Sequence, residues 1–331
     1  MKMFHSIKLD NIPSNKMKSN NNPYSKMTKL NKTLSTIWRY RALYIMMLPG
    51  IIYYIIFKYG PMYGILIAFK DYQFLKGIWG SPWANPWYKH FLYFYKTPYF
   101  KELIVNTLLI SIYKLFWGMP SSIILALLLN EVKNKTFKRI TQTITYMPHF
   151  LSWVIIYGIT FALLSETYGI VNEWIKNIFD KTIPFMTSTK WFRTILVATE
   201  VWKDTGWGAI IYLAAIAGID PTIFESSKLD GASKVQMMFY ITIPSISNVI
   251  VLLLILRLGN ILNAGFDQIF IMSNPMVLPV ADIIDTWVFR TGIYDLNFSL
   301  STAVGLFKSV IAMVLIVTVN KIARKWGEAL W

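Results

Sequence analysis

The side chains with the greatest capacity for chemistry are polar groups that interrupt long apolar runs. The run 192–217 contains Glu200, Lys203 and Asp204 with Trp202 and Trp207 nearby, and the run 245–262 contains Arg257 and Asn260. Charged groups inside a membrane-spanning run are costly and usually face a cavity or a partner. Aromatic rings beside carboxylates and amides suit a sugar, which offers a flat apolar face rimmed by hydroxyls. These groups are therefore candidates for a substrate path through the membrane. The residues that we expect along this path are Glu200, Trp202, Lys203, Asp204, Trp207, Arg257, Asn260 and Asn263.

The same residues also allow a structural interpretation. Glu200 lies three residues before Lys203 and four before Asp204, so all three share one face of a helix. Pairing of Glu200 with Lys203, and of Arg257 with Asp204, would then lock helices together. The sequence leaves both interpretations open. Lys114, in an earlier apolar run, is expected to be structural or to lie near the membrane interface.

The composition of the chain indicates its class of protein. Its 331 residues are 55% hydrophobic and only 15% charged, with a net charge of +16, whereas globular proteins are about a quarter charged. A basic balance often indicates nucleic acid, but here the basic residues stand among apolar runs, so we expect no nucleic-acid partner. The apolar content excludes intrinsic disorder, and the absence of cysteine excludes a disulfide-stapled domain. The composition indicates a multi-spanning membrane protein.

Six apolar segments predict an all-α polytopic fold with six transmembrane helices. Each is near the roughly 20 residues that a helix needs to cross the hydrocarbon core. The fifth is the weakest, because Arg257 and Asn260 interrupt it. The predicted spans are Leu43–Phe69, Leu103–Leu129, Thr143–Leu164, Phe192–Ala217, Ser245–Leu262 and Ser301–Asn320.

The distribution of Lys and Arg sets the expected orientation. With the N-terminus in the cytoplasm, the inner segments carry a net charge of +12 and the outer segments +2. The positive-inside rule therefore favours both termini inside. Residues 1–41 have nine basic residues and one acid, and no apolar h-region follows the N-terminus, as it would in a signal peptide. We expect a flexible cytoplasmic tail at 1–41 and a transmembrane domain at 42–331.

The predicted outer loop between the first two spans is rich in aromatic residues. Trp and Tyr favour the membrane–water boundary, so an interfacial belt, or packing on the outer helix ends, is the simpler interpretation. A sugar-stacking surface is the alternative. The aromatic residues are Trp79, Trp83, Trp87, Tyr88, Phe91, Tyr93, Phe94, Tyr95, Tyr99 and Phe100.

The predicted cytoplasmic loop 218–244 carries the most informative motif. It predicts a short helix with Pro221 in its first turn, a break at Gly231, a second amphipathic helix, and a proline at the next membrane entry. A helix–turn–helix between two spans suits a partner with a groove. An ordinary solvated connector is the alternative.

This loop resembles the E-A-A, D-G-A, Q, I-T-L-P signature of permease subunits of binding-protein-dependent ABC importers. Matching residues, in order and spacing, are Glu225, Asp230, Gly231, Ala232, Gln236, Ile241, Thr242 and Pro244. Ser226 and Ser227 replace the two alanines of the signature, and Met238 replaces a common phenylalanine. From about Trp38 onward the chain is similar to the LplB-type subgroup, which transports polysaccharides and oligosaccharides.

The resemblance implies a type I ABC importer permease fold and a set of partners. Two permease subunits, here expected to be a heterodimer, would form the translocation path in the cell membrane. Two cytoplasmic ATPase subunits would bind ATP and magnesium, and an extracellular solute-binding lipoprotein would deliver the sugar. The chain itself would be a transporter subunit without catalytic residues or a cofactor. The implied ATPase-coupling residues are Glu225, Asp230, Gly231, Ala232, Gln236 and Pro244.

Other classes fit the residues less well. An importer of the same type for a non-sugar solute remains open. An ion-coupled secondary transporter would not need the 218–244 loop, and a membrane sugar transferase would want acids or histidines gathered at one face. The three histidines, His5, His90 and His149, are far apart, so we expect no metal site. Asp282 and Asp285 resemble a carboxylate pair, but helix capping or contact with the binding protein is the preferred interpretation.

Overall fold

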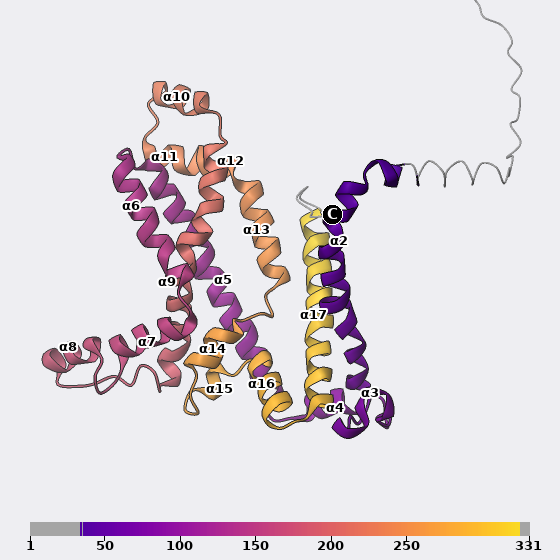
Figure 1. Cartoon of the computed structure of the whole chain (residues 1–331). Helices are drawn as coiled ribbons and strands as arrows, with labels where there is room; N and C mark the ends of the chain where they lie inside the picture. The colour runs from indigo at the N-terminus through magenta and orange to yellow at the C-terminus, as the bar shows by residue number, and fades with distance from the viewer. Residues whose placement is uncertain (1–33, 35, 325–331) are drawn as a thin grey trace, which may run out of the picture. The chain divides into compact units, whose positions relative to one another are not determined.

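The structure is a computed structural model of the chain, and it describes residue 34 and residues 36–324 (Figure 1). Two compact units divide the chain, Met1–Gly64 and Ile65–Trp331. Within the described residues, every regular element is helical, and the single β-bridge joins Lys70 to Trp83. The predicted tail 1–41 lies almost entirely outside these residues.

The first candidate membrane span is apolar except for Arg41 and Lys58. It begins with α2 (Arg41–Tyr54), continues as the π-helix η1 (Ile55–Tyr59) and ends as the 3₁₀ helix η2 (Gly60–Phe69). No side chain of α2 is buried within the chain. An apolar helix of 29 residues with exposed side chains is suited to lipid. Pro49 lies inside α2, and the winding changes at Gly60.

The centre of the second unit is the pair of long helices α5 (Phe100–Glu131) and α9 (Thr189–Ala217), which pack along each other. Small residues bring the neighbours of α9 close. A Cβ on Gly206 would overlap the Thr145 carbonyl oxygen of α6 (Lys135–Tyr146), and one on Gly208 would lie 2.5 Å from Ser122 Oγ of α5. A core of Ala126, Leu127, Ala209, Tyr212, Ile216 and Ile246 fills the same region.

Shorter helices pack near the two ends of this pair. At the starting end of α9 lie α14 (Phe266–Met272), α15 (Leu278–Ala281) and α16 (Ile284–Phe289), and at its other end lies α10 (Pro221–Leu229) (Figure 1). The other bounds are η3 (Phe74–Lys76), α3 (Gly77–Gly80), α4 (Lys89–Lys96), η4 (Met147–Phe150), α7 (Trp153–Leu164), α8 (Ile170–Phe179), α11 (Lys234–Met237), η5 (Met238–Thr242), α12 (Ile243–Ser245), α13 (Ser247–Gly259), η6 (Arg290–Tyr294) and α17 (Phe298–Arg324).

Between three and six segments of the described chain meet the requirements of a membrane span. Three helices are long and apolar enough alone: Arg41–Phe69, Phe100–Glu131 and Phe298–Arg324. Three bent pairs qualify only when each is taken together, with bends of 105°, 74° and 61°. The six-span, N-in and C-in arrangement therefore stays a prediction.

The expected third span, Thr143–Leu164, is wrong as a single helix. The chain bends by 105° between the segments 135–150 and 153–164. Pro148 lies in η4 at this break, and the Ser152 hydroxyl accepts the Ile155 N–H to start α7. The apolar run continues through the bend, so its composition did not reveal it. The expected fifth span is also shorter than predicted, because α13 has 13 residues, or about 20 Å.

The aromatic loop divides into exposed and buried parts. Trp79, Trp83 and Trp87 are exposed, whereas Phe94 is buried against Phe100, Trp287 and Phe307. The exposed tryptophans remain compatible with either predicted role. Phe94 instead packs in the core that joins α4 to α16 and α17.

Candidate functional site

A small polar hollow lies where α5, α9 and the end of α13 meet. Its volume is about 200 Å³, below the ~300–1,000 Å³ of typical small-molecule sites. Five of the eight predicted path residues line it, together with a buried serine and a buried lysine of α5. The polar lining residues are Ser111, Lys114, Glu200, Asp204, Arg257, Asn260 and Asn263.

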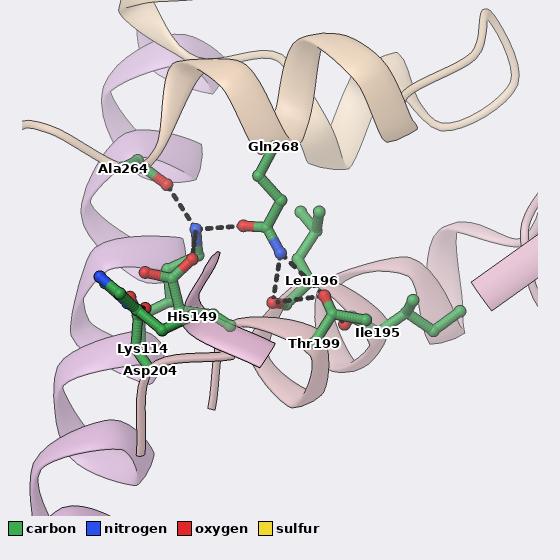
Figure 2. Close-up of polar contacts among 9 residues, drawn as sticks. Lys114, His149, Ile195, Leu196, Thr199, Asp204, Ala264 and Gln268 are labelled. Carbon is green, nitrogen blue, oxygen red and sulfur yellow. Dashed lines mark hydrogen bonds and ion pairs between the residues drawn. The ribbon is translucent and has the colours of Figure 1, made fainter. Parts of the chain in front are cut away.

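Lys114 holds the wall of this hollow together. Its Nζ lies 3.2 Å from Glu200 Oε2, donates to the Ala264 carbonyl at 2.8 Å, and also donates to Gln268 Oε1. Gln268 in turn donates from Nε2 to the Leu196 carbonyl at 2.7 Å and to Thr199 Oγ1 at 2.8 Å. Figure 2 shows these contacts converging from three parts of the fold. Lys114 thus joins α5 to α9 and to the segment that begins α14.

Asp204 faces a different partner. Its Oδ1 lies 2.8 Å from His149 Nδ1 of η4. The imidazole also stacks on the Trp207 ring, with centroids 4.5 Å apart and planes within 2°. One turn of α9 thus supplies both the carboxylate and the ring that position His149. This contact was not predicted, because residues 149 and 204 lie 55 positions apart in the sequence.

Lys203 is turned away from the hollow. Its Nζ donates to the carbonyls of His149 and Leu151 at 2.6 Å and 2.5 Å, and to that of Pro148 at 3.4 Å. These carbonyls stand at the break between η4 and α7, where helical hydrogen bonds end. The expected Glu200–Lys203 pair is therefore wrong: Glu200 pairs with Lys114, and Lys203 caps a neighbouring helix end.

The end of α13 supplies the open side of the hollow. Asn260 Nδ2 donates to the Leu256 carbonyl at 3.1 Å, and Asn263 Oδ1 accepts from Lys308 of α17 at 2.7 Å. Arg257 and Asp204 both line the hollow, but within the described residues the structure forms no ion pair between them. The expected Arg257–Asp204 pair is wrong, since Asp204 is bonded to His149.

Trp202 does not join the other predicted residues. It lines a separate hollow of about 340 Å³ with Thr145, Pro148, Thr205 and Gly206. Trp202 lies two positions from Glu200 and Asp204, on another face of α9. Trp202 is therefore close to the other path residues in sequence, but it does not line the same hollow.

Sequence reasoning missed the role of Gln268 and underestimated Lys114. Gln268 is fully buried and makes three side-chain hydrogen bonds, but a glutamine in a moderately apolar stretch gives no distinctive signal. The expectation that Lys114 is structural agrees with its contacts. Asp282 and Asp285 also form ion pairs: Asp282 with Arg290 at 2.5 Å, and Asp285 with Lys308 at 2.6 Å.

The signature loop forms a compact helical hairpin. Asp220 Oδ1 accepts the Thr222 N–H at 2.9 Å and caps α10, with Pro221 in its first turn. This backbone contact lowers the pKa of the Asp220 carboxyl below its usual value. The other end of α10 is a Schellman turn, in which Gly231 has φ +81°. The Ala232 N–H donates to the Ser227 carbonyl, and the Gly231 N–H donates to that of Lys228.

The second half of the hairpin has its own cap. Ser233 and Gln236 form a reciprocal capping box, with the Ser233 N–H donating to Gln236 Oε1 at 2.8 Å. Lys234 lies 3.1 Å from Glu131 at the end of α5. The Gly231, Ala232 and Gln236 positions of the signature thus form the hydrogen bonds that fix the turn and the cap of this loop. Glu225 and Asp230 are exposed, and Pro244 lies in α12.

This geometry agrees with the comparisons with known proteins. Residues 118–327 match the family described as binding-protein-dependent transport system inner membrane component. The chain belongs to this family. It is therefore the membrane-embedded permease component of a transport system and not an enzyme.

Individual relatives extend the match to nearly the whole chain. The permease is 43% identical to protein LplB of Bacillus subtilis over 89% of this chain and 92% of the relative. It is also 43% identical to the polygalacturonan/rhamnogalacturonan transport system permease protein YteP of the same organism, over 92% and 94%. A chain of a bacterial alginate ABC transporter, solved in complex with an alginate pentasaccharide-bound periplasmic protein, superposes with a TM-score of 0.81 at 38% identity. That match covers 89% of this chain and 98% of the other. These matches confirm the type I permease fold.

Proposed function

We propose that this permease carries oligosaccharides or polysaccharide fragments through an ATP-driven importer of the plasma membrane. The observation that carries the proposal is the near full-length similarity, at 43% and 38% identity, to proteins named for transport of polygalacturonan, rhamnogalacturonan and alginate. An extracellular binding lipoprotein delivers the substrate, and a second, related permease completes the path. The chain crosses the membrane six times with both termini inside.

The loop 218–244 contacts a cytoplasmic ATPase subunit, which binds ATP and magnesium. The exposed groups at the turn of the hairpin support this role. Glu225 and Asp230 offer carboxylates to a basic groove, and Gly231 and Ala232 permit close approach. Gln236 keeps the second half of the loop in shape, and Pro244 begins the return to the membrane. Movement of the loop, tied to α5 through Lys234 and Glu131, shifts the spans as rigid bodies.

The polar hollow is the part of the substrate path that this chain supplies. Glu200 and Asp204 stand on α9, and Arg257, Asn260 and Asn263 stand at the end of α13. Lys203 and Trp207 support the wall by holding η4 in place. Trp202 faces its own hollow, so we assign it no direct contact with the sugar in the 200 Å³ hollow.

Copurification and transport by two variants of one glycine test the proposal. Gly231→Val places a β-branched residue at positive φ, where it is strained, whereas Gly231→Asn is tolerated there. We expect the Val variant to lose copurification with the ATPase and ATP-dependent uptake of trigalacturonate into proteoliposomes. We expect the Asn variant to retain both. Uptake that needs an ion gradient and no ATPase would overturn the proposal in favour of a secondary transporter.

A further inference from the structure

The polar groups of the hollow divide into those with partners and those without. Lys114 and Glu200 pair with each other, Asp204 is bonded to His149, and Asn263 accepts from Lys308. Three other polar groups of the hollow have no such partner in the part of the chain that the structure describes. Ser111 Oγ is buried without a hydrogen-bond partner. The Arg257 guanidinium and Asn260 Oδ1 also form no hydrogen bond, since the Asn260 side chain bonds only through Nδ2.

The Arg257 guanidinium lies close to both central helices, because each has a glycine without a side chain at that position. A Cβ on Gly118 of α5 would lie 3.5 Å from Arg257 Nη1, and one on Gly208 of α9 would lie 4.0 Å from Nη2. These glycines leave room for the guanidinium beside the wall of the hollow. Arg257 is nevertheless exposed, so a ligand can reach it.

A guanidinium group in a membrane-spanning segment is costly unless it pairs with an anion or faces a water-filled cavity. Of the carboxylates that line the hollow, Glu200 lies 3.2 Å from Lys114 and Asp204 lies 2.8 Å from His149, and in the described residues neither forms an ion pair with Arg257. The guanidinium group is therefore available to an anion from outside this part of the chain. The planar fork of a guanidinium matches a carboxylate through two parallel hydrogen bonds.

From this partition we infer that Arg257 binds the carboxylate of an acidic sugar, so that the permease selects uronate-containing oligosaccharides. The inference rests on the proposed function and names the substrate class. Asn260 Oδ1 accepts from a sugar hydroxyl, and the Ser111 hydroxyl completes the polar floor. A hollow of about 200 Å³ holds one sugar unit at a time, with the rest of the chain outside it.

Uptake by the complete transporter, with its companion permease, ATPases and binding protein in proteoliposomes, tests the inference. The probes are trigalacturonate and its fully methyl-esterified form, which has the same rings without the charge. The variant is Arg257→Gln, and the matched control is Arg139→Gln on the exposed surface of α6. The same binding protein serves every permease variant, so a change in the acid-to-ester ratio of initial rates reports on the permease alone.

We expect Arg257→Gln to lower the acid-to-ester ratio at least tenfold, Arg257→Lys to restore part of it, and Arg139→Gln to leave it unchanged. An equal loss of both rates would overturn the inference and indicate that Arg257 pairs with a carboxylate of the companion permease. An unchanged ratio would overturn it as well. Wild-type uptake of the ester without the acid would overturn the acidic class while leaving the proposed function intact. Uptake of neither probe would overturn the proposed function and the inference together.

Discussion

Lys114 Nζ and Glu200 Oε2 lie 3.2 Å apart across the contact between α5 and α9, and the Lys114 side chain is only 9% exposed. The ion pair is reinforced on the lysine side by the Ala264 carbonyl and Gln268. Three segments that are far apart in sequence are therefore held at one ammonium group. This arrangement makes the stability of the central helix pair depend on charge as well as on apolar packing.

Removal of either charge alone is expected to destabilise the fold. Lys114→Met or Glu200→Gln leaves an uncompensated charge at a largely buried position, which costs about 3–5 kcal/mol. The double variant should cost less than the sum of the two, because no lone charge remains. Thermal and denaturant unfolding in detergent micelles measures these costs. Strict additivity of the two substitutions would contradict the coupling, and the exposed control Glu225→Gln should change stability by less than about 0.5 kcal/mol.

Gly206 is expected to tolerate no side chain. A Cβ there would overlap the backbone carbonyl of Thr145, so Gly206→Ala must separate α6 from α9, at about 1–3 kcal/mol. Gly158→Ala in α7 is the matched control, because nothing lies within 4 Å of its added Cβ. The control should be neutral or slightly stabilising, since alanine favours a helix. Melting temperatures of the two purified variants make the comparison, and equal values would refute the close approach.

Lys203 is expected to protect the break between η4 and α7. Lys203→Met leaves the carbonyls of His149 and Leu151 without their donor, a loss of about 1–3 kcal/mol for each unsatisfied group. Amide hydrogen exchange of peptides covering 147–160 should then quicken by about tenfold or more, at 1.4 kcal/mol per factor of ten. Lys190→Met, on the exposed start of α9, should leave the exchange unchanged. Equal protection in both variants would show that the break is held by other contacts.

Asp220 is expected to make the order of α10 sensitive to acid. Its pKa is lowered by the Thr222 N–H, so the stabilisation is present above the unfolded pKa of about 3.9 and is lost as the pH falls through the lower folded value. The chain has no cysteine, so a spin label on Cys at exposed Leu229 reports on α10 alone. Its mobility should rise below this pH in wild type but not in Asp220→Asn, which caps without titrating. Identical profiles would exclude Asp220 as the titrating group.

The sequence predicted the long helices and the break at Gly231, but missed the bend within 143–164. The runs 103–129, 192–217 and 301–320 lie within α5, α9 and α17, because long apolar segments favour helices in a membrane. The run 143–164 failed because hydropathy carries no information on direction, and Pro148 with the Ser152 cap bends the chain without interrupting the apolar composition. The loop was predicted through its motif, and the structure supplies the reason for the spacing of Asp230, Gly231 and Gln236.

The site was predicted in part. A helical face identified Glu200 and Asp204 as neighbours, and both line the hollow. Their partners were not predictable, because Lys114 lies 86 positions from Glu200 and His149 lies 55 positions from Asp204. Local spacing favoured Lys203 as the partner of Glu200, but backbone carbonyls at a helix break compete for the same ammonium group.

The caps of α10 bear on how tightly the signature loop can bind a partner protein. Asp220 caps one end of the helix and the Gly231 turn caps the other, so both ends are capped by groups of this chain. A loop that is ordered before it binds loses little conformational entropy on association. Under the function proposed above, the loop would therefore enter the groove of an ATPase subunit without the thermodynamic cost of folding on contact.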